Sequence, residues 1–355
     1  TGSQDRFKGN ILLVIFYHPL SGTSNQNQNI FQEFCFPRIT ANVSLGGRDI
    51  LDLDSLSIEE YEMILQTAAE MKKIMKRDIK KVPSLRGKSI INLFYEPSTR
   101  TRNSFELAGK YLGADVVNIT TASSSVVKGE CLRDTILTVQ SMACDAIVMR
   151  HPIEGAAAYA AEVADPVIIN AGDGAHAHPS QGLLDMFTIR EQGKDLKGLK
   201  MAILGDVLYS RVARTNIAAW TKMGADVHVA GPMTLLPHDI ESLGVTVHKR
   251  VEDAIEGADV IDVLRIQLER QKKGLFPSPR EYARIFGLNE KRLALAKPDV
   301  TVLHPGPMNR GLEISWEVGY CDNAAIRDEV QNGVAVRMAL LFLTLTGGKQ
   351  IENID

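Results

Sequence analysis

A run of hydroxyl and guanidinium side chains is the clearest candidate for an anion-binding site. Its members are Ser98, Thr99, Arg100, Thr101 and Arg102. The run directly follows the apolar segment 90–94. Ser98 and Thr99 favour a helix start, where backbone N–H groups and the helix dipole attract anions. The competing interpretation is a capped helix with solvated arginines, in which Arg102 pairs with Glu106. The combination directly after a buried strand favours phosphate binding.

A neutral polar cluster is predicted at another strand end. Gly172 and Gly174 form a turn that lets the backbone approach a ligand closely. Pro179 suits the first turn of a helix, which leaves His178 and Gln181 at its mouth. A lone loop histidine is more often a satisfied polar residue than a catalyst, but this combination favours a ligand site. No third ligand stands at metal spacing, so we predict no metal site.

Guanidinium and amide side chains also follow three other apolar runs. Arg150 comes directly after 146–149, and Arg211 comes shortly after 201–204. Arg265 and Gln267 follow another run. Charged runs usually form solvated faces, but arginines at the carboxyl edge of a sheet are better explained by anion or carboxylate recognition. The dinucleotide fingerprint G-x-G-x-x-G is absent after 201–204, so we predict no nicotinamide cofactor.

Two loops complete the candidate set. The loop 120–130 is rich in hydroxyl groups and contains Lys128. We interpret it as a lid with a movable cation, and the alternative is a mobile surface loop. The Pro-Gly-Pro segment 305–307 holds backbone carbonyl groups in place at low entropic cost.

Together these residues predict a phosphate site on one half of the chain and carboxylate-binding arginines on the other. A neutral polar cluster lies between the two. This is the chemistry of transfer from an activated phosphate to an amino acid, although it does not name the transferred group. The interpretation requires Arg100 and Arg265 to face one common cleft.

The elements that must position these residues alternate between strand and helix. Ser57 and Glu60 form a capping box for a first helix, with Leu56 and Tyr61 as a hydrophobic staple. Apolar runs then follow at 90–94, 116–119, 146–149 and 167–170, and again at 201–204, 227–230, 260–263 and 300–303. Such alternation predicts parallel sheets that bind ligands beyond the carboxyl ends of their strands. We therefore predict an α/β protein with two doubly wound parallel-sheet domains joined by helices. A last helix over 323–346 returns to the first domain.

Composition narrows the class of protein. The chain has 355 residues, of which 45% are hydrophobic and 23% charged, as in soluble globular proteins. Its net charge of −3 argues against a nucleic-acid binder. No apolar run is long enough to span a membrane, and no secretory signal is evident. The four cysteines are scattered without a C-x-x-C pair, which favours a reducing compartment. We predict a cytoplasmic location.

Several of these motifs resemble the aspartate and ornithine carbamoyltransferases. The run 98–102, Met-Arg-His-Pro at 149–152 and His-Pro-Ser-Gln at 178–181 are similar to the signatures of this family, and the likeness extends over about 47–348. The segments 264–270 and 128–130 resemble the aspartate branch. Ornithine enzymes typically carry Ser-Met-Gly and His-Cys-Leu-Pro instead. Gly306 stands where some aspartate enzymes have Leu, and Val212 where some have Thr, so we expect altered affinity with retained chemistry.

The resemblance implies transfer of the carbamoyl group of carbamoyl phosphate to the α-amino group of L-aspartate, the step that commits to pyrimidines. It implies neither a cofactor nor a covalent nucleophile. The implied carbamoyl-phosphate contacts are Ser98, Thr99, Arg100, Thr101, Ser124, Arg150, His178, Gln181, Gly306 and Pro307. The implied aspartate contacts are Lys128, Arg211, Arg265, Gln267 and Pro305. The implied catalytic groups are Arg100, Thr101, Lys128, Arg150 and His178.

The resemblance also predicts domains and assembly. We expect an N-terminal extension of unknown role over 1–46. A carbamoyl-phosphate domain is expected over 47–182 with about 323–348, and an aspartate domain over 183–322. The chain opens with Thr-Gly-Ser and no Met, which suggests a tag remnant or a processed end. In the family Ser124 and Lys128 reach into a neighbouring subunit, which implies a homotrimer with shared sites. A dihydroorotase or regulatory chain is a further possible partner.

Two other interpretations stay open. A carbamoyltransferase for another amino acid, such as ornithine, differs in which amine it accepts. A catalytically silent scaffold homologue would usually lack the phosphate arginine or the lid lysine, and this chain has both Arg100 and Lys128.

Overall fold

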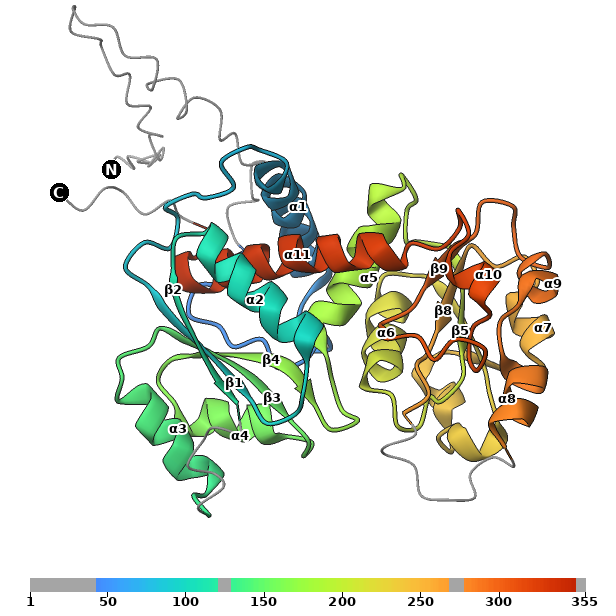
Figure 1. The fold of residues 1–355 in the computed structure, drawn as a ribbon, viewed down its shortest axis with the longest axis horizontal. Coiled ribbons are helices and arrows are strands. Elements are labelled where there is room, and N and C mark those ends of the chain that lie inside the picture. Colours follow the sequence, from blue (N-terminus) through green and yellow to red (C-terminus); the bar gives the residue numbers. More distant parts are fainter. Residues whose placement is uncertain (1–42, 121–128, 268–277, 349–355) are drawn as a thin grey trace, which may run out of the picture. The chain divides into compact units, whose positions relative to one another are not determined.

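The computed structural model describes residues 43–120, 129–267 and 278–348, which belong to one compact unit, Pro37–Asp355. Within this unit the chain forms two β-sheets with helices packed on them (Figure 1). Every strand pair in both sheets is parallel. The predicted fold class, two parallel-sheet α/β domains, is therefore confirmed.

The first sheet has four strands in the order β2-β1-β3-β4. Their bounds are β1 Ser89–Phe94, β2 Asp115–Thr120, β3 Ala146–His151 and β4 Val167–Asp173. β1, β3 and β4 are buried over nearly their whole length. Because helices cover both faces of such a sheet, these strands have continuous apolar runs and not alternating sequences.

Four helices accompany the first sheet. They are α1 Ile58–Met75, α2 Thr99–Tyr111, α3 Leu132–Gln140 and α4 Ala156–Val163. α3 and α4 share a hydrophobic core with β1, β3 and β4, whereas α2 packs on β1 and β2. α1 begins with the predicted capping box, in which Ser57 and Glu60 exchange hydrogen bonds of 3.2 and 2.7 Å.

The second sheet has five strands in the order β7-β6-β5-β8-β9. Their bounds are β5 Lys200–Leu204, β6 Asp226–Ala230, β7 Thr246–His248, β8 Val260–Val263 and β9 Thr301–Leu303. The sequence analysis missed β7. This strand has three residues, is partly exposed and contains no apolar run, so it depends on pairing with β6.

Short helices surround the second sheet. They are α6 Arg211–Lys222, α7 Val251–Ile255, α8 Pro279–Phe286, α9 Glu290–Leu293 and α10 Trp316–Gly319, with 3₁₀ turns η4 Met233–Leu235 and η5 Ile240–Leu243. α6 packs on β6 and also contacts α5, whereas α7 packs across β5, β6 and β7.

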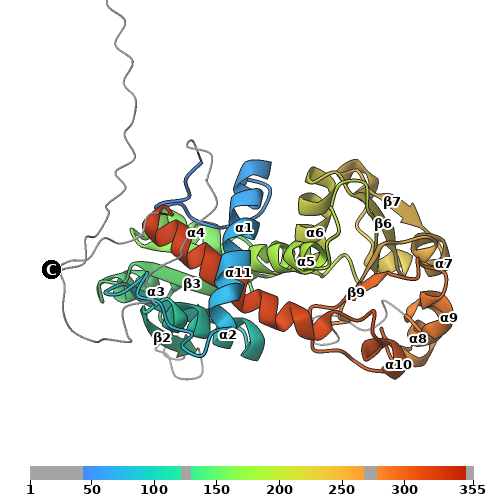
Figure 2. The same cartoon turned by 90° about the horizontal axis from the view of Figure 1, so that it is seen from above.

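Two helices connect the sheets. α5, Pro179–Glu191, follows β4 and packs against α6. α11, Ile326–Thr346, follows the second sheet and packs along α1, α2 and α5 (Figures 1 and 2). The predicted return of the last helix to the first domain is confirmed, since α11 packs on α1 and α2. The helix begins at Ile326 and not at 323, because Asn323 and Ala325 hydrogen-bond to the backbone of Val302 in β9 at 2.8 and 3.0 Å.

Strand order determines where ligands can enter. In the first sheet β1 lies between β2 and β3, so the order reverses between β1 and β3. In the second sheet the reversal lies between β5 and β8. Crevices form beyond the carboxyl ends of strands at such reversals. Within residues 43–120, 129–267 and 278–348, each helix is too short or too polar to cross a membrane.

Candidate active site

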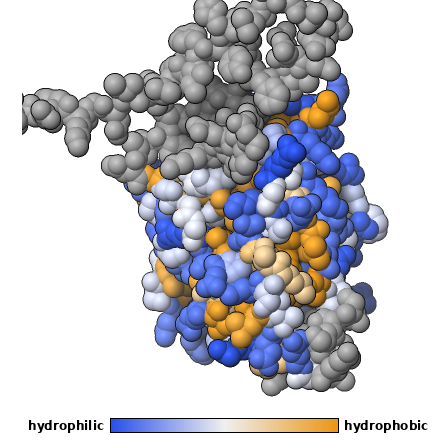
Figure 3. Space-filling model, turned by 90° about the vertical axis from the view of Figure 1, so that its left-hand side faces the viewer, coloured by the Kyte–Doolittle hydropathy of each residue, from blue (hydrophilic) through white to orange (hydrophobic). Residues whose placement is uncertain are grey.

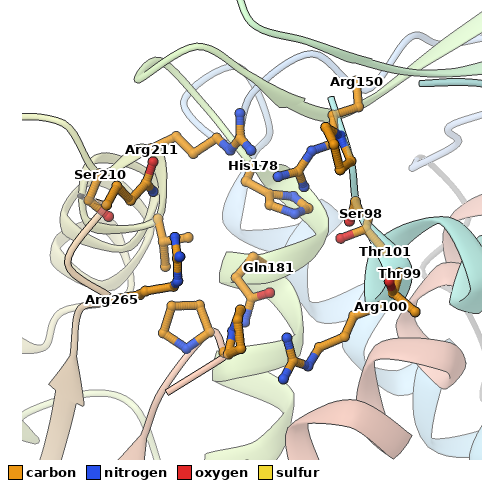
Figure 4. A pocket seen from close by; sticks show the side chains of 16 residues that line it. Ser98, Thr99, Arg100, Thr101, Arg150, His178, Gln181, Ser210, Arg211 and Arg265 are labelled. Carbon is orange, nitrogen blue, oxygen red and sulfur yellow. The ribbon is translucent and has the colours of Figure 1, made fainter. Parts of the chain in front are cut away.

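A cavity of about 360 Å³ lies where the carboxyl ends of the two sheets meet (Figure 4). Its wall contains every implied substrate contact that falls in the described ranges, namely Ser98, Thr99, Arg100, Thr101, Arg150, His178, Gln181, Arg211, Arg265, Gln267, Pro305, Gly306 and Pro307. Arg102, the last member of the predicted anion-binding run, does not line this cavity. Pro97, Ser210 and Val212 also line it. Ser124 and Lys128 lie outside the described residues. Arg100 and Arg265 thus face one common cleft.

The cavity wall is strongly electropositive. It contains four arginines and no carboxylate, although the chain as a whole has a net charge of −3. In Figure 4, Arg211 and Arg265 lie on one side, Arg100 and Arg150 on the other, and His178 between them. Guanidinium groups on opposite walls suit a ligand with an anionic group at each end.

The N-terminus of α2 supplies one end of the cavity. Ser98 is the N-cap residue and has extended backbone dihedral angles. Its side chain makes no capping hydrogen bond to the described residues. Ser98 and the first residues of α2 line the cavity, so the hydroxyl group and the first backbone N–H groups are available to a ligand there, and the helix dipole adds partial positive charge.

The 305–307 loop closes over Arg100. Gly306 has a φ of +60°, and a Cβ atom there would come within 2.8 Å of Arg100 Cζ. A larger residue would therefore have to displace this guanidinium group. His304 supports the loop through a hydrogen bond. Its Nδ1 accepts from the Gly306 N–H at 2.8 Å, and its Nε2 lies 3.1 Å from Glu313 Oε1. Because Nδ1 accepts, Nε2 carries the hydrogen and donates to the carboxylate.

Glu96 connects the arginines of the two sheets, and the sequence analysis missed it. Its Oε2 accepts from Arg150 Nε at 3.2 Å and from Arg211 Nη2 at 2.9 Å. Arg211 also donates to the Gly174 carbonyl at 3.1 Å. Glu96 directly precedes the phosphate run, so its position at a strand end among arginines was the available signal. Glu96 does not itself line the cavity, and it holds the guanidinium groups of Arg150 and Arg211, which do.

Irregular pairing between β3 and β4 brings the backbone close to these side chains. Met149 pairs with Asn170 and His151 with Asp173, so β4 has one extra residue opposite Arg150. The sequence analysis ended this strand before Arg150, but pairing continues through His151 because of this bulge. A Cβ atom at Gly172 would lie 2.8 Å from Arg211 Nε, so glycine is needed there.

The turn before α5 holds His178 in place. The buried Asp173 carboxylate accepts from Gly155 N–H at 2.8 Å, from Asn170 Nδ2 at 2.8 Å and from Ala177 N–H at 3.1 Å. The backbone N–H of His178 donates to Thr215 Oγ1 of α6 at 2.9 Å. These bonds position the histidine independently of any ligand.

The His178 imidazole is neutral in this environment. Burial lowers its pKa well below the ordinary value, and the charges of Arg211, Arg150 and Arg337 lower it further. A neutral imidazole can donate one hydrogen bond to a carbonyl oxygen without adding charge.

Arg265 and Gln267 extend from the carboxyl end of β8. The backbone carbonyl between them, that of Ile266, accepts from Asn309 Nδ2 at 3.0 Å. Asn309 in turn donates its backbone N–H to Glu313 at 2.6 Å. The segment that carries Arg265 and Gln267 is therefore tied to the same carboxylate that supports the 305–307 loop.

Nothing in the described ranges gathers three or more His, Cys, Asp or Glu side chains in an arrangement that could hold a metal ion. The absence of a metal and of a cofactor stays a prediction.

The chain matches one protein family over both of its sheets. Residues 48–191 match the carbamoyl-phosphate-binding domain of aspartate/ornithine carbamoyltransferases, and residues 197–344 match their Asp/Orn-binding domain. The chain is 60% identical to the aspartate carbamoyltransferase catalytic subunit of Desulforamulus reducens, over 85% of this chain and 96% of the relative. It is also 60% identical to that of Moorella thermoacetica, over 85% and 99%.

Solved structures share the fold. Trypanosoma cruzi aspartate transcarbamoylase in complex with N-(phosphonacetyl)-L-aspartic acid is 31% identical, with a TM-score of 0.78 over 86% of this chain and 98% of that one. Ornithine carbamoyltransferase from Pyrococcus furiosus is 32% identical, with a TM-score of 0.76 over 86% and 99%.

Proposed function

The chain belongs to the aspartate/ornithine carbamoyltransferase family, and on that premise we propose that it carbamoylates L-aspartate. It transfers the carbamoyl group of carbamoyl phosphate to the α-amino group, giving N-carbamoyl-L-aspartate and phosphate, a step toward pyrimidines. The observation that carries this proposal is the single cavity with arginines on opposite walls. The aspartate branch is favoured over the ornithine branch by relatives at 60% identity.

Carbamoyl phosphate would occupy the α2 side of the cavity. Its phosphate would accept bonds from the hydroxyl and N–H groups at the helix start and from Arg100 and Arg150. His178, as a neutral donor, would bond to the carbonyl oxygen, and Gln181 would contact the carbamoyl NH₂. The Gly306 and Pro307 backbone lies alongside.

L-Aspartate would occupy the opposite side. Its two carboxylates require two cationic partners, and Arg211 and Arg265 supply them. Gln267 and Pro305 line the space beside Arg265. Lys128 is proposed as a third cation from the lid.

The reaction needs positioning and charge stabilisation. The uncharged α-amino nitrogen attacks the carbonyl carbon and the C–N bond forms. The C–O bond then breaks with its electron pair leaving on phosphate, and the phosphate takes up the proton that the nitrogen loses. Negative charge grows on the carbonyl oxygen and on the bridging oxygen, next to His178, Thr101, Arg100 and Arg150. Fixed donors in a site that excludes water stabilise such charge, and positioning of two substrates can contribute roughly 7–11 kcal/mol.

We propose that the two sheets are the cores of the two substrate domains. The first comprises 47–182 together with about 323–348, and the second 183–322. Packing of α11 on α1 and α2 supports assigning the last helix to the first domain. The family matches divide the chain slightly later, between 191 and 197, after α5.

A homotrimer with shared sites is also proposed, as is a cytoplasmic location. β2 is an edge strand of the first sheet, and its Val117 is 54% exposed. Leu107 of α2 is also exposed. Figure 3 shows this end of the molecule, where apolar and polar side chains are interspersed. An exposed edge strand with apolar side chains is suited to coverage by another subunit.

The test is a direct assay. The purified protein is incubated with carbamoyl phosphate and either L-aspartate or L-ornithine, and both released phosphate and carbamoylated product are measured. We expect equal amounts of phosphate and N-carbamoyl-L-aspartate, and only background with ornithine. Phosphate release without carbamoylaspartate, or a preference for ornithine, would contradict the proposal.

A further inference from the structure

A chain of buried polar side chains runs from the cavity into the second sheet. Gln181 of the cavity wall donates its Nε2 to Asp185 Oδ1 at 2.9 Å. Asn216 of α6 donates its Nδ2 to the other oxygen of Asp185 at 2.9 Å and to Asp262 Oδ2 at 2.9 Å. Asp185, Asn216 and Asp262 are at most 1% exposed. Buried polar groups at this depth are costly unless they are hydrogen-bonded.

The first bond of this chain sets the orientation of the Gln181 amide. An ionised carboxylate accepts hydrogen bonds and cannot donate them, so Asp185 requires the NH₂ group of Gln181 on its side. The Gln181 carbonyl oxygen is then left to face the cavity. A carbonyl oxygen at that place can accept a hydrogen bond from the NH₂ group of a carbamoyl ligand. With the Gln181 amide flipped, its own NH₂ group would face the NH₂ group of the ligand, and no hydrogen bond could form.

Asn216 is the middle of this arrangement. Its single NH₂ group bridges Asp185 and Asp262, which would otherwise repel each other when ionised. The bridge also reaches β8, whose end leads directly to Arg265. A few buried hydrogen bonds thus join the Gln181 amide, which faces the proposed carbamoyl phosphate, to β8. This strand leads to Arg265, the proposed aspartate contact.

The charges around the bridge determine which carboxyl is ionised. Three buried carboxyl groups lie near one another, those of Asp185 in α5, Asp262 in β8 and Glu329 in α11, and the guanidinium of Arg337 in α11 is close to Asp185. Burial raises the pKa of Asp185 to about 6, against hydrogen bonds from Asn216 and Gln181. Burial and the charge of Asp185 raise the pKa of Asp262 to about 8, and burial raises that of Glu329 well above its ordinary value.

At neutral pH this pattern leaves Asp185 as the ionised carboxyl, opposite Arg337, with protons on Asp262 and Glu329. Asp185 is therefore the acceptor that the Gln181 amide requires.

We propose that Asn216 and Asp262 are positioning residues, which act through Asp185 to hold the carbonyl oxygen of Gln181 toward the carbamoyl NH₂ group of carbamoyl phosphate. This inference rests on the proposed function. It assigns to the buried bridge a part of the discrimination between carbamoyl phosphate and free phosphate, because the Gln181 contact concerns only the carbamoyl end.

The test compares two ligands in one site. Dissociation constants for freshly dissolved carbamoyl phosphate and for inorganic phosphate are measured by calorimetry on the full-length protein and on Asn216→Leu. Loss of one oriented hydrogen bond should weaken carbamoyl phosphate by roughly threefold to tenfold, and leave inorganic phosphate within about twofold. Equal weakening of both ligands, or of neither, would overturn the proposal.

Asn332→Leu is the matched control. Asn332 is also fully buried, but its bonds lead to Lys72 and Thr188 at 2.6 and 2.9 Å and not to the cavity wall. It should lower stability without changing the ratio of the two dissociation constants. A similar change of the ratio in this control would mean that any loosening of the interior has the same effect, which would also overturn the proposal.

Asp262 provides a second pair of variants that does not depend on the folding of Asn216→Leu. Asp262→Asn keeps an oxygen that can accept from Asn216, whereas Asp262→Leu does not. The leucine variant should lose more of the preference for carbamoyl phosphate than the asparagine variant. The wild-type preference should decline as the pH rises past about 8, and Asp262→Asn should lack that decline. Identical pH profiles would contradict the proposal.

Different results would contradict the proposed function and the positioning role of Asn216 and Asp262. If the wild-type protein binds carbamoyl phosphate no more tightly than inorganic phosphate and forms no carbamoylaspartate, the proposed function is wrong. If the wild-type protein has both properties and Asn216→Leu keeps the full preference, only the positioning role is wrong.

Discussion

At the scale of single residues, the cavity wall places its arginines on two opposite sides. Arg100 is at the start of α2 and under Gly306, whereas Arg265 follows β8. His178 lies between them and is held neutral by burial and by the charges of nearby arginines. Substitutions at the two ends should therefore have different kinetic consequences.

Arg100→Ala should lower turnover by orders of magnitude. The guanidinium group would stabilise charge on the leaving phosphate, and charge-assisted donors in a fixed site have effects of about 10²–10³-fold. Steady-state rates of carbamoylaspartate formation provide the measurement. Arg284→Ala, at an exposed arginine of α8, is the control and should behave as wild type. Near-normal turnover in Arg100→Ala would show that this residue was misassigned.

Arg265→Ala should mainly weaken aspartate binding. The proposed contact is to a substrate carboxylate and not to the reacting atoms, so we expect KM for aspartate to rise by roughly tenfold or more, as for the loss of a bond to a charged group. Carbamoyl-phosphate binding should change little. An unchanged aspartate saturation curve would rule out the carboxylate role.

At the scale of elements, α5, α6, β8 and α11 meet in a buried cluster of carboxyl groups beside the site. An ionised Asp262 would destabilise the folded state, because a charged carboxylate is costly to bury, so Asp262 keeps its proton there. Its pKa of about 8 in the folded protein lies far above the ordinary value of 3.8. Stability should therefore depend on pH through this residue.

The direction of this pH dependence follows from how many protons the folded and unfolded states bind. Between about pH 4 and pH 8 the folded protein holds a proton on Asp262 that the unfolded chain has lost, so the free energy of unfolding falls as the pH rises through this window and levels off above it. Asp262→Asn does not titrate and should be more stable than wild type at about pH 8, by an amount on the order of a few kcal/mol.

Urea unfolding at several pH values measures this difference. The gap between Asp262→Asn and wild type should widen as the pH rises from about 5 to about 8. Parallel pH dependences would mean that Asp262 does not carry a raised pKa in the folded state.

At the scale of the whole molecule, the two sheets contribute opposite walls of one cavity, and Glu96 connects the two walls through Arg150 and Arg211. The proposed trimer adds a further contribution, because Lys128 would act in the site of a neighbouring subunit. Shared sites can therefore be tested with trimers that contain two different variant chains.

Mixed trimers of Arg100→Ala and Lys128→Ala chains should regain activity. Each parent should be nearly inactive, but a mixed trimer contains some sites with both residues intact. The measurement is the rate after the two inactive proteins are dissociated and reassembled together. Each parent treated alone is the control. No recovery in verified mixed trimers would count against shared sites.

Much of the site was predictable because its signals are local. The run from Ser98 to Arg102 follows a buried strand and combines a helix cap with cationic side chains, a pattern that predicts an anion site. The structure places Ser98, Thr99, Arg100 and Thr101 in the cavity wall. Strand positions were also predictable within a few residues, because parallel strands covered on both faces have continuous apolar sequences. β7 was missed because its three residues carry no such pattern.

The amino-acid sequence by itself therefore determined the alternation of strands and helices, and the placing of arginine and hydroxyl side chains at strand ends. Only the tertiary structure decided that both order reversals, between β1 and β3 and between β5 and β8, open into the same cavity. It also decided that Asp262, which the sequence presents as one position in an apolar run, meets Asn216 and Asp185. Pairing of strands and burial of charge depend on segments far apart in the chain, and no local pattern specifies them.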